Sequence, residues 1–170
     1  MRYPGGLNRA ITFSMDDGVQ QDMWFVKLLE QYGMKGTFNL NSGRFVSRDH
    51  IYPEGKVWRA MVDDDVLPTY TNPYADVACH TVTHPTLMNA SEAEIADEIL
   101  SDRINLERRF GRIITGLAIP NGPYDDTTID VGRRCGLTYM RSARSSFSFE
   151  FPKELCPFDP TCAYDDEQLP

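Results

Sequence analysis

The fold is decided by the stretch AITFSMDDGVQQDMWFVKLLEQYGMKGTFNL, which covers residues 10–40. Residues 10–15 form an apolar, partly alternating run that predicts a strand, and this strand ends at a turn where Gly18 allows a sharp change of direction. Residues 19–32 repeat apolar side chains at helical spacing, and residues 36–40 return to a short apolar strand. A helix between two such strands predicts a βαβ unit and therefore a parallel sheet.

The alternation of strand and helix continues to about residue 141, so we expect one α/β domain over residues 1–170. Further strands are predicted at residues 77–79, 113–119 and 137–140, and helices at residues 57–61, 91–110 and 126–135. Residues 41–75 break this rhythm with prolines, glycines and an acidic run. We expect an inserted surface loop region there, of the kind that can line a binding cleft.

The composition is that of a soluble globular protein, with 41% hydrophobic residues and a net charge of -8. The acidic balance disfavours a nucleic-acid partner, because binding to a phosphate backbone needs a basic face. No apolar run approaches the ~20 residues that span a bilayer, so we expect no membrane partner. The start of the chain lacks the apolar centre of a signal peptide, and the four cysteines form no CxxC pair. We therefore expect a cytoplasmic location, or a secreted one if a leader has been removed.

Two of the three histidines lie four residues apart in the sequence CHTVTHP, residues 79–85. In an extended backbone, four steps place both imidazoles on the same side, and Pro85 favours an extended conformation for His84. Residues 77–79 have the apolar character of a buried strand end. Two imidazoles aimed together from a strand end form half of a metal site, whereas the simpler alternative is a hydrogen-bonded histidine pair in a loop.

Two adjacent carboxylates, Asp16 and Asp17, follow the first predicted strand and point to different sides of it. The carboxyl ends of parallel strands meet at one rim, so these carboxylates and the histidines are expected to lie close together. Two imidazoles and one carboxylate leave coordination positions open, as in catalytic zinc sites. The second carboxylate could then take a proton from water, which indicates hydrolysis of an amide or ester. The alternative for Asp17 is a helix cap.

The same residues resemble the motifs of the polysaccharide deacetylases, the NodB-homology or carbohydrate esterase 4 family. TFSMDDG at residues 12–18 looks like the first motif of that family, and HTVTHP at residues 80–85 matches the second. PNGPY at residues 120–124 is similar to the third. Order and spacing agree over about residues 9–141. The resemblance implies a distorted (β/α) barrel that acts on an acetylated carbohydrate.

The resemblance also implies roles for individual residues. The ligands of a divalent metal, usually zinc and alternatively Co²⁺, Ni²⁺ or Mn²⁺, would be Asp17, His80 and His84. Asp16 would be the general base, and the backbone N–H of Asn121 would stabilise the oxyanion. In the family an arginine that orients the base often stands at the position that Ala118 occupies here.

The chain departs from the family pattern toward its C-terminus. The family's general acid is a later histidine, and no histidine follows His84. The last two or three strands of the barrel also lack counterparts. We therefore expect a domain that is C-terminally incomplete, with strand edges that a missing segment or an oligomer would cover.

These observations lead to three functional hypotheses. The leading one is a metal-dependent hydrolase that removes acetyl groups from N-acetylated sugars, in which metal-activated water attacks the amide carbonyl and Asp16 is the base. The second is a non-catalytic metal- or carbohydrate-binding module of the same fold, which the absent acid and the absent arginine favour. The third is an iron oxygenase with the same ligand set, but those ligands usually lie on an all-β scaffold.

Overall fold

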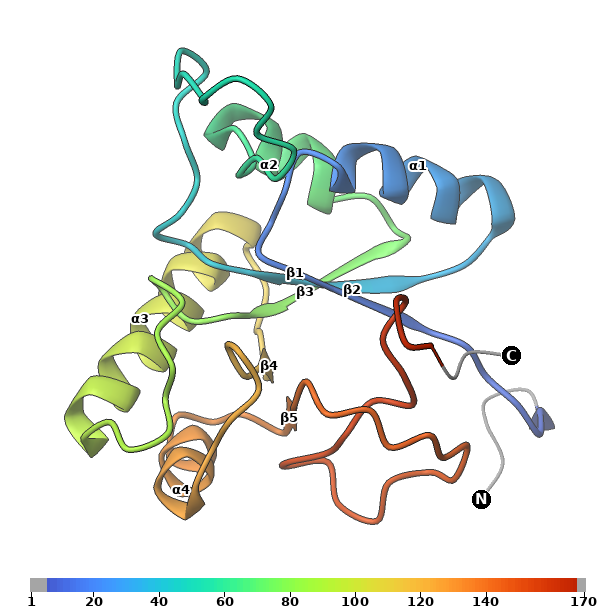
Figure 1. Ribbon diagram of the computed structural model, residues 1–170, viewed down its shortest axis with the longest axis vertical. Coiled ribbons are helices and arrows are strands. Elements are labelled where there is room, and N and C mark those ends of the chain that lie inside the picture. Colours follow the sequence, from blue (N-terminus) through green and yellow to red (C-terminus); the bar gives the residue numbers. More distant parts are fainter. Residues whose placement is uncertain (1–5, 168–170) are drawn as a thin grey trace.

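The computed structural model describes residues 6–167, and in this part of the chain strands and helices alternate as predicted (Figure 1). The strands are β1 (Phe13–Asp16), β2 (Gly36–Leu40), β3 (Ala75–Cys79), β4 (Gly116–Ala118) and β5 (Tyr139–Arg141). The helices are α1 (Asp22–Tyr32), α2 (Asp63–Tyr70), α3 (Glu92–Phe110) and α4 (Asp126–Arg134). Among these described helices, none combines the length and the apolar character that crossing a bilayer requires.

The five strands form one parallel sheet in the order β1-β2-β3-β4-β5. The sheet curls into half of a barrel, with the helices on its outer side (Figure 1). This arrangement confirms the predicted fold class. Because every strand runs in the same direction, the segments that follow β1, β3 and β4 all leave the sheet at one rim.

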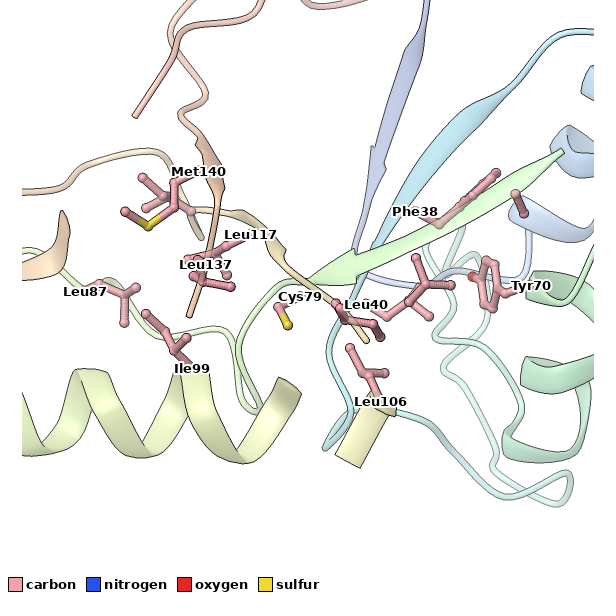
Figure 2. Close-up of a cluster of buried hydrophobic side chains, with 14 of the residues drawn as sticks. Phe38, Leu40, Tyr70, Cys79, Leu87, Ile99, Leu106, Leu117, Leu137 and Met140 are labelled. Carbon is pink, nitrogen blue, oxygen red and sulfur yellow. The ribbon is translucent and has the colours of Figure 1, made fainter. Parts of the chain in front are cut away.

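The hydrophobic core lies between the curled sheet and the helices that cover it. Figure 2 shows Leu106 and Ile99 of α3 directed toward the strands, with Cys79 and Leu117 close to them. The buried Phe38 and Tyr70 lie at the other end of the cluster, and Leu40 lies between the two ends, near Cys79 and Leu106. The central strands β2, β3 and β4 are mostly buried, because helices and the curl of the sheet cover both of their faces.

The start of one helix follows its local sequence signal, and the start of another does not. Helix α3 begins close to the predicted residue with a capping box, in which the Ser91 hydroxyl accepts a hydrogen bond from the Glu94 N–H. Helix α1 begins at Asp22, three residues later than predicted. The delay arises because Val19 pairs with Ala60 in an isolated bridge, and the Gln20 N–H donates to Arg59 at 2.9 Å.

The segment 41–75 contains the clearest error of the sequence-based secondary structure. The helix predicted at residues 57–61 is absent, because these residues extend along the turn after β1, where the Met61 N–H donates to the Gly18 carbonyl at 2.8 Å. The helix of this segment is α2, which starts at the acidic run. Acidic side chains in a first helical turn are favourable beside the helix dipole, and Val66 and Tyr70 then bury its apolar side.

The chain beyond β5 returns to the sheet and covers part of its outer edge. Residues 155–160 run beside β5, where Arg141 and Phe158 form a parallel bridge. The Met140 N–H donates to Leu155 at 2.8 Å, and the Phe158 N–H donates to Met140 at 2.8 Å. The prediction that only a missing segment or an oligomer would cover the strand edges is therefore wrong for the edge at β5.

Candidate metal centre and active site

The turn after β1 separates two neighbouring carboxylates. Asp17 has a φ of 75° and Gly18 a φ of 64°, so the backbone reverses sharply just after Asp16. A Cβ at Gly18 would also lie 3.2 Å from Leu40 and 3.3 Å from Phe45, which favours glycine at this position. The turn directs the two carboxylates toward different partners.

Asp17 faces both histidines that follow β3. Its Oδ1 atom lies 3.4 Å from Nε2 of His84 and 3.8 Å from Nε2 of His80. One ligand atom of each of the three residues lies within 4.8 Å of the other two. The structure thus brings together the three residues that the sequence analysis selected as metal ligands. A carboxylate oxygen and two imidazole nitrogens are a suitable donor set for a divalent transition metal or zinc.

The environment of His80 prepares its ring for coordination. Nδ1 lies 2.8 Å from the carbonyl oxygen of Ala118, which can only accept, so Nδ1 carries the proton and Nε2 presents its lone pair toward Asp17. The ring is buried, and this burial lowers the pKa of His80 and favours the neutral form that binds metals. A carbonyl behind a metal-ligating histidine is the usual way of fixing its ring orientation.

The two rings converge for a reason that differs from the predicted one. The predicted extended conformation of His84 is wrong, because its φ is 68° and that of Thr81 is 66°. The His84 N–H donates to the Thr81 hydroxyl at 3.1 Å, which stabilises this left-handed turn. The loop therefore folds back on itself, and the rings meet with their centroids 4.7 Å apart.

Buried polar side chains from two other elements hold this loop in place. The amide of Asn41 donates to the carbonyls of both His80 and Thr81, the latter at 2.9 Å. On α3, the fully buried Asp102 accepts from the His80 N–H at 3.0 Å and from the Ser42 N–H at 2.8 Å. Burial raises the pKa of Asp102 to about 6, and these backbone hydrogen bonds oppose the rise. Asp102 therefore lies on the buried face of α3, although it is a charged residue.

A second buried carboxylate lies under the turn after β1. Asp22, the first residue of α1, accepts at Oδ2 from the Val19 N–H at 3.1 Å and from the Tyr70 hydroxyl at 2.6 Å. Its Oδ1 atom is buried and has no hydrogen-bond partner among residues 6–167. Burial raises the pKa of Asp22 to about 6, with smaller contributions from the nearby negative charges of Asp16 and Asp17.

Asp16 is held by a different set of residues from Asp17. Its Oδ1 atom accepts from the Asn39 amide at 2.8 Å and from the Arg141 guanidinium. Ala118 stands where an arginine often orients the base in the resembling family, and the structure places the arginine Arg141 beside Asp16 instead, at the end of β5. The sequence analysis missed both Asn39 and Arg141. One signal was available, since each is a polar residue within a predicted sheet strand or at its end.

The turn after β4 supplies the third part of the rim. Asn121 has a φ of 61°, its side chain donates to the Thr86 hydroxyl at 3.0 Å, and the Gly122 N–H donates to Ile119 at 3.1 Å. Within the described part of the chain, the backbone N–H of Asn121 makes no hydrogen bond. This is the group that the sequence analysis selected to bind an oxyanion.

Arg44 adds a positive charge beside the candidate metal centre. Its guanidinium lies 3.2 Å from Oδ1 of Asp17 and 4.9 Å from the centroid of the Trp58 ring. The arginine thus contacts the oxygen of Asp17 that faces the histidines. Its position neutralises part of the negative charge that Asp16, Asp17 and Asp22 bring to this end of the sheet.

Comparison with known proteins identifies the kind of molecule to which this site belongs. The sequence profile of the polysaccharide deacetylase family matches residues 5–140. No curated protein sequence gives a significant match. Among solved structures, the chain is similar to IcaB from Ammonifex degensii, with a TM-score of 0.78 and 16% sequence identity over 98% of this chain and 71% of that one.

Two further structures share the fold. A polysaccharide deacetylase from Bacillus cereus, BC0361, has a TM-score of 0.74 and 17% identity over 91% of this chain and 47% of that one. The Streptococcus pyogenes deacetylase PplD, solved in complex with acetate, has a TM-score of 0.69 and 18% identity, covering 86% of this chain. The chain spans 61% of the length of PplD and about half of the Bacillus protein. At these identities the likeness shows the fold, and the half-barrel corresponds to part of a (β/α) barrel.

Proposed function

The chain belongs to the polysaccharide deacetylase family, and from this premise we propose that it is a metal-dependent hydrolase that removes acetyl groups from N-acetylated sugars. The proposal assigns Asp17, His80 and His84 to a divalent metal, with zinc as the preferred ion. It assigns Asp16 to proton transfer. The family match and the donor set at the rim support this assignment.

The observation that carries the proposal is that two adjacent carboxylates, Asp16 and Asp17, have different partners. Asp17 faces two imidazole nitrogens, at 3.4 and 3.8 Å, whereas Asp16 is hydrogen-bonded to an amide and a guanidinium. A purely structural turn would not need two carboxylates with such different neighbours. A hydrolase of this family needs one carboxylate that binds a metal and one that remains available as a base.

The residues of the chain divide the reaction between them. A divalent ion, when bound, supplies Lewis acidity to the acetyl carbonyl and to water. Asp16 accepts the proton of the attacking water at Oδ2, because Oδ1 is occupied by its hydrogen bonds to Asn39 and Arg141. The free backbone N–H of Asn121 donates to the oxyanion that develops on the carbonyl oxygen. His80 is oriented by the Ala118 carbonyl and stays neutral.

Acetate release from N-acetylglucosamine oligomers tests the proposal, with protein that has been stripped with a chelator and reloaded with zinc. We expect release only after zinc is added. The Asp16→Asn variant is expected to lower kcat by about 10²–10⁴-fold, since it removes a general base. The His84→Ala variant is expected to lose zinc binding, which a competition titration with a chromophoric chelator measures directly.

His50→Ala is the matched control for the histidine variant. His50 is exposed and meets the Tyr52 ring edge to face, with the ring centroids 4.5 Å apart, so its loss should change neither zinc affinity nor acetate release. If zinc-loaded protein releases no acetate, and if Asp16→Asn changes nothing, the hydrolase assignment is wrong.

A second candidate function is a metal- or carbohydrate-binding module without turnover. The observation that favours it is Ala118, which stands where the family often has the arginine that orients the base. Calorimetry with the same oligomers separates the two functions. Binding that is unaffected by Asp16→Asn and is not followed by acetate release would favour the module.

A further inference from the structure

The inserted segment beside the candidate metal centre carries a charge opposite to that of the whole chain. The protein has a net charge of -8. Residues 44–59 nevertheless hold four cationic side chains and two acidic ones, which gives this segment a net charge of +2: Arg44, Arg48, Lys56 and Arg59 against Asp49 and Glu54. A positive segment at the rim of an acidic protein attracts anionic ligands toward the site.

Hydrogen bonds hold this segment against both turns that carry the candidate metal ligands. On the side of the turn after β1, the Gln21 side-chain amide donates to the Val57 carbonyl at 2.8 Å. On the side of the loop between β3 and α3, the Gly43 N–H donates to the Val82 carbonyl at 3.1 Å, and a Cβ at Gly43 would lie 2.7 Å from the Val82 side chain. Arg44 therefore follows directly after a close contact with the loop that carries the two histidines.

Three cations of the segment lie over aromatic rings. The Arg44 guanidinium lies 4.9 Å from the centroid of the Trp58 ring, and the Lys56 ammonium lies 5.6 Å from the same centroid. The Arg59 guanidinium lies 5.8 Å from the centroid of the Tyr52 ring. Within residues 6–167, neither Lys56 nor Arg59 forms an ion pair. A cation that is held on a ring face keeps its charge available to a ligand.

The acidic run at the start of α2 is paired with other cations. Asp63 binds Arg109 at 2.6 Å, and Arg48 lies 3.5 Å from Asp64 and 3.0 Å from Asp65. These three carboxylates therefore do not neutralise the cations that lie over the aromatic rings.

Arg44 already binds one carboxylate and has donors for another. One of its terminal nitrogens lies 3.2 Å from Oδ1 of Asp17, and the two side chains are 32% and 27% exposed. A guanidinium has five N–H donors in a planar fork, and this contact uses one of its nitrogens. When Asp17 acts as a metal ligand, it shares its negative charge with the ion and balances less of the charge of Arg44. A carboxylate from a ligand can then bind the remaining donors, while a sugar ring lies on the apolar face of Trp58.

We propose that Arg44, Lys56 and Trp58 form a subsite for a carboxylate-bearing sugar unit, and that the preferred substrate is therefore an acidic glycan in which uronic-acid-type units neighbour N-acetylated ones. The inference rests on the proposed deacetylase function for the identity of the acetylated unit. Because Arg44 contacts a candidate metal ligand, the carboxylate belongs to the unit next to the one that is deacetylated.

Calorimetry tests the subsite with hyaluronan hexasaccharide, in which N-acetylglucosamine alternates with glucuronate. Its methyl ester is the matched ligand, because it keeps the sugars and removes the charges. Zinc-loaded Asp16→Asn protein is used, so that turnover does not consume the ligand. We expect the acid to bind about 10-fold more tightly than the ester, which is the size of one charge-assisted hydrogen bond. This ratio should shrink as the salt concentration rises.

Variants in the same background assign the preference to individual residues. Arg44→Gln should bring the ratio of acid to ester affinity to within about twofold of one, and Lys56→Gln should lower it in part. Trp58→Ala should weaken the binding of both ligands. Arg48→Gln is the matched control, since it removes the same charge from the same segment, but Arg48 binds Asp64 and Asp65. Its ratio should equal that of the parent protein.

The outcomes separate this inference from the hydrolase assignment. Equal affinity for the acid and the ester, binding of neither ligand, or the same ratio in Arg44→Gln and Arg48→Gln would overturn the subsite. If zinc-loaded wild-type protein releases acetate from N-acetylglucosamine oligomers in that case, the hydrolase assignment stands. If the acid binds in an Arg44-dependent way and no acetate is released from either kind of oligomer, the subsite is supported and the hydrolase assignment falls.

Discussion

Two buried carboxylates, Asp22 and Asp102, support the two turns that carry the candidate metal ligands, and they are satisfied differently. Asp102, from the middle of α3, uses each oxygen once, to bind the N–H groups of His80 and Ser42. Asp22, at the start of α1, uses Oδ2 twice and leaves Oδ1 without a partner in the described residues. Burial raises the pKa of both to about 6.

The difference shows two ways in which a buried carboxylate can stabilise a turn at the rim of the sheet. Asp102 joins the segment after β2 to the segment after β3 through the N–H groups of Ser42 and His80, so its loss should loosen a candidate metal ligand. Asp22 accepts both of its hydrogen bonds, from the Val19 N–H and from the Tyr70 hydroxyl, at Oδ2. An asparagine, which has one acceptor oxygen, should therefore be able to replace it. Both carboxylates carry the cost of a buried charge, and their hydrogen bonds to backbone N–H groups and to the Tyr70 hydroxyl offset part of that cost.

Asp102→Ala should have the largest effect. It leaves the Ser42 N–H without an acceptor among the described residues, and it removes one of the two acceptors of the His80 N–H, which also donates to the Leu40 carbonyl at 2.9 Å. A lost hydrogen bond of this kind is worth about 1–3 kcal/mol, and removing the buried charge offsets part of the loss. We expect a net loss of about 2–5 kcal/mol in the free energy of unfolding, and a 10–100-fold weaker zinc affinity, as for other residues that orient metal ligands. Urea unfolding and a zinc competition titration measure the two effects.

Ser91→Ala is the control for that variant. It removes the N-cap of the same helix and should cost about 1 kcal/mol without changing zinc affinity. Equal zinc affinity in Asp102→Ala and Ser91→Ala would mean that Asp102 serves the helix and has no special role at the His80 loop.

Asp22→Asn should change the pH dependence of stability. The pKa of Asp22 is about 6 in the folded protein and near 3.8 when unfolded, so the folded state binds the extra proton between about pH 4 and 6. This contribution to stability is present below about pH 4 and is lost as the pH rises through 6. At 1.36 kcal/mol per pKa unit, the variant should gain about 3 kcal/mol relative to wild type between pH 4 and 7. Urea unfolding of chelator-treated protein at both pH values measures this gain. A constant difference between the two proteins would contradict the assignment of Asp22.

Tyr70→Phe should have the smallest effect of the three. It removes the 2.6 Å hydrogen bond to Asp22 but keeps the ring in the core, so we expect a loss of about 1.5 kcal/mol at pH 7. The loss should shrink in the Asp22→Asn background, because a hydrogen bond to a neutral amide is weaker. A double-mutant cycle of thermal or urea unfolding measures the coupling. Strictly additive losses would show that the two side chains do not act as a pair.

The sequence predicted the elements that have a regular apolar period and the site residues that lie in recognisable motifs. Helical periodicity located α3. The spacing of His80 and His84 predicted that their rings lie together, and the resemblance to the family's motifs added Asp17 to them; the structure brings all three residues together. Local signals failed where a distant partner decides the outcome. The helix predicted at residues 57–61 does not form, because these residues pair with the turn after β1. The left-handed conformation of His84 is stabilised by the hydrogen bond from its N–H to the Thr81 hydroxyl.

Asp102 shows what a more careful analysis of spacing could have added. It lies three residues after Ile99 and four before Leu106, so it belongs to the same buried stripe of α3. A charged residue within an apolar stripe needs a partner, and that partner lies in loops that α3 reaches only in the folded chain. Arg141 was equally hidden, because its partners Ser14 and Asp16 lie more than a hundred residues earlier in the sequence.

The left-handed backbone at Asp17, Thr81, His84 and Asn121 limits how far this protein could be improved by engineering. Glycine tolerates that conformation freely, and a residue with a Cβ pays roughly 1 kcal/mol or more to adopt it. A search for thermostable variants should therefore favour glycine at positions where the chemistry needs a carboxylate or an imidazole. The most thermostable variants of this protein would be those in which glycine replaces the candidate metal ligands Asp17 and His84. Selection for thermostability alone would therefore remove the site.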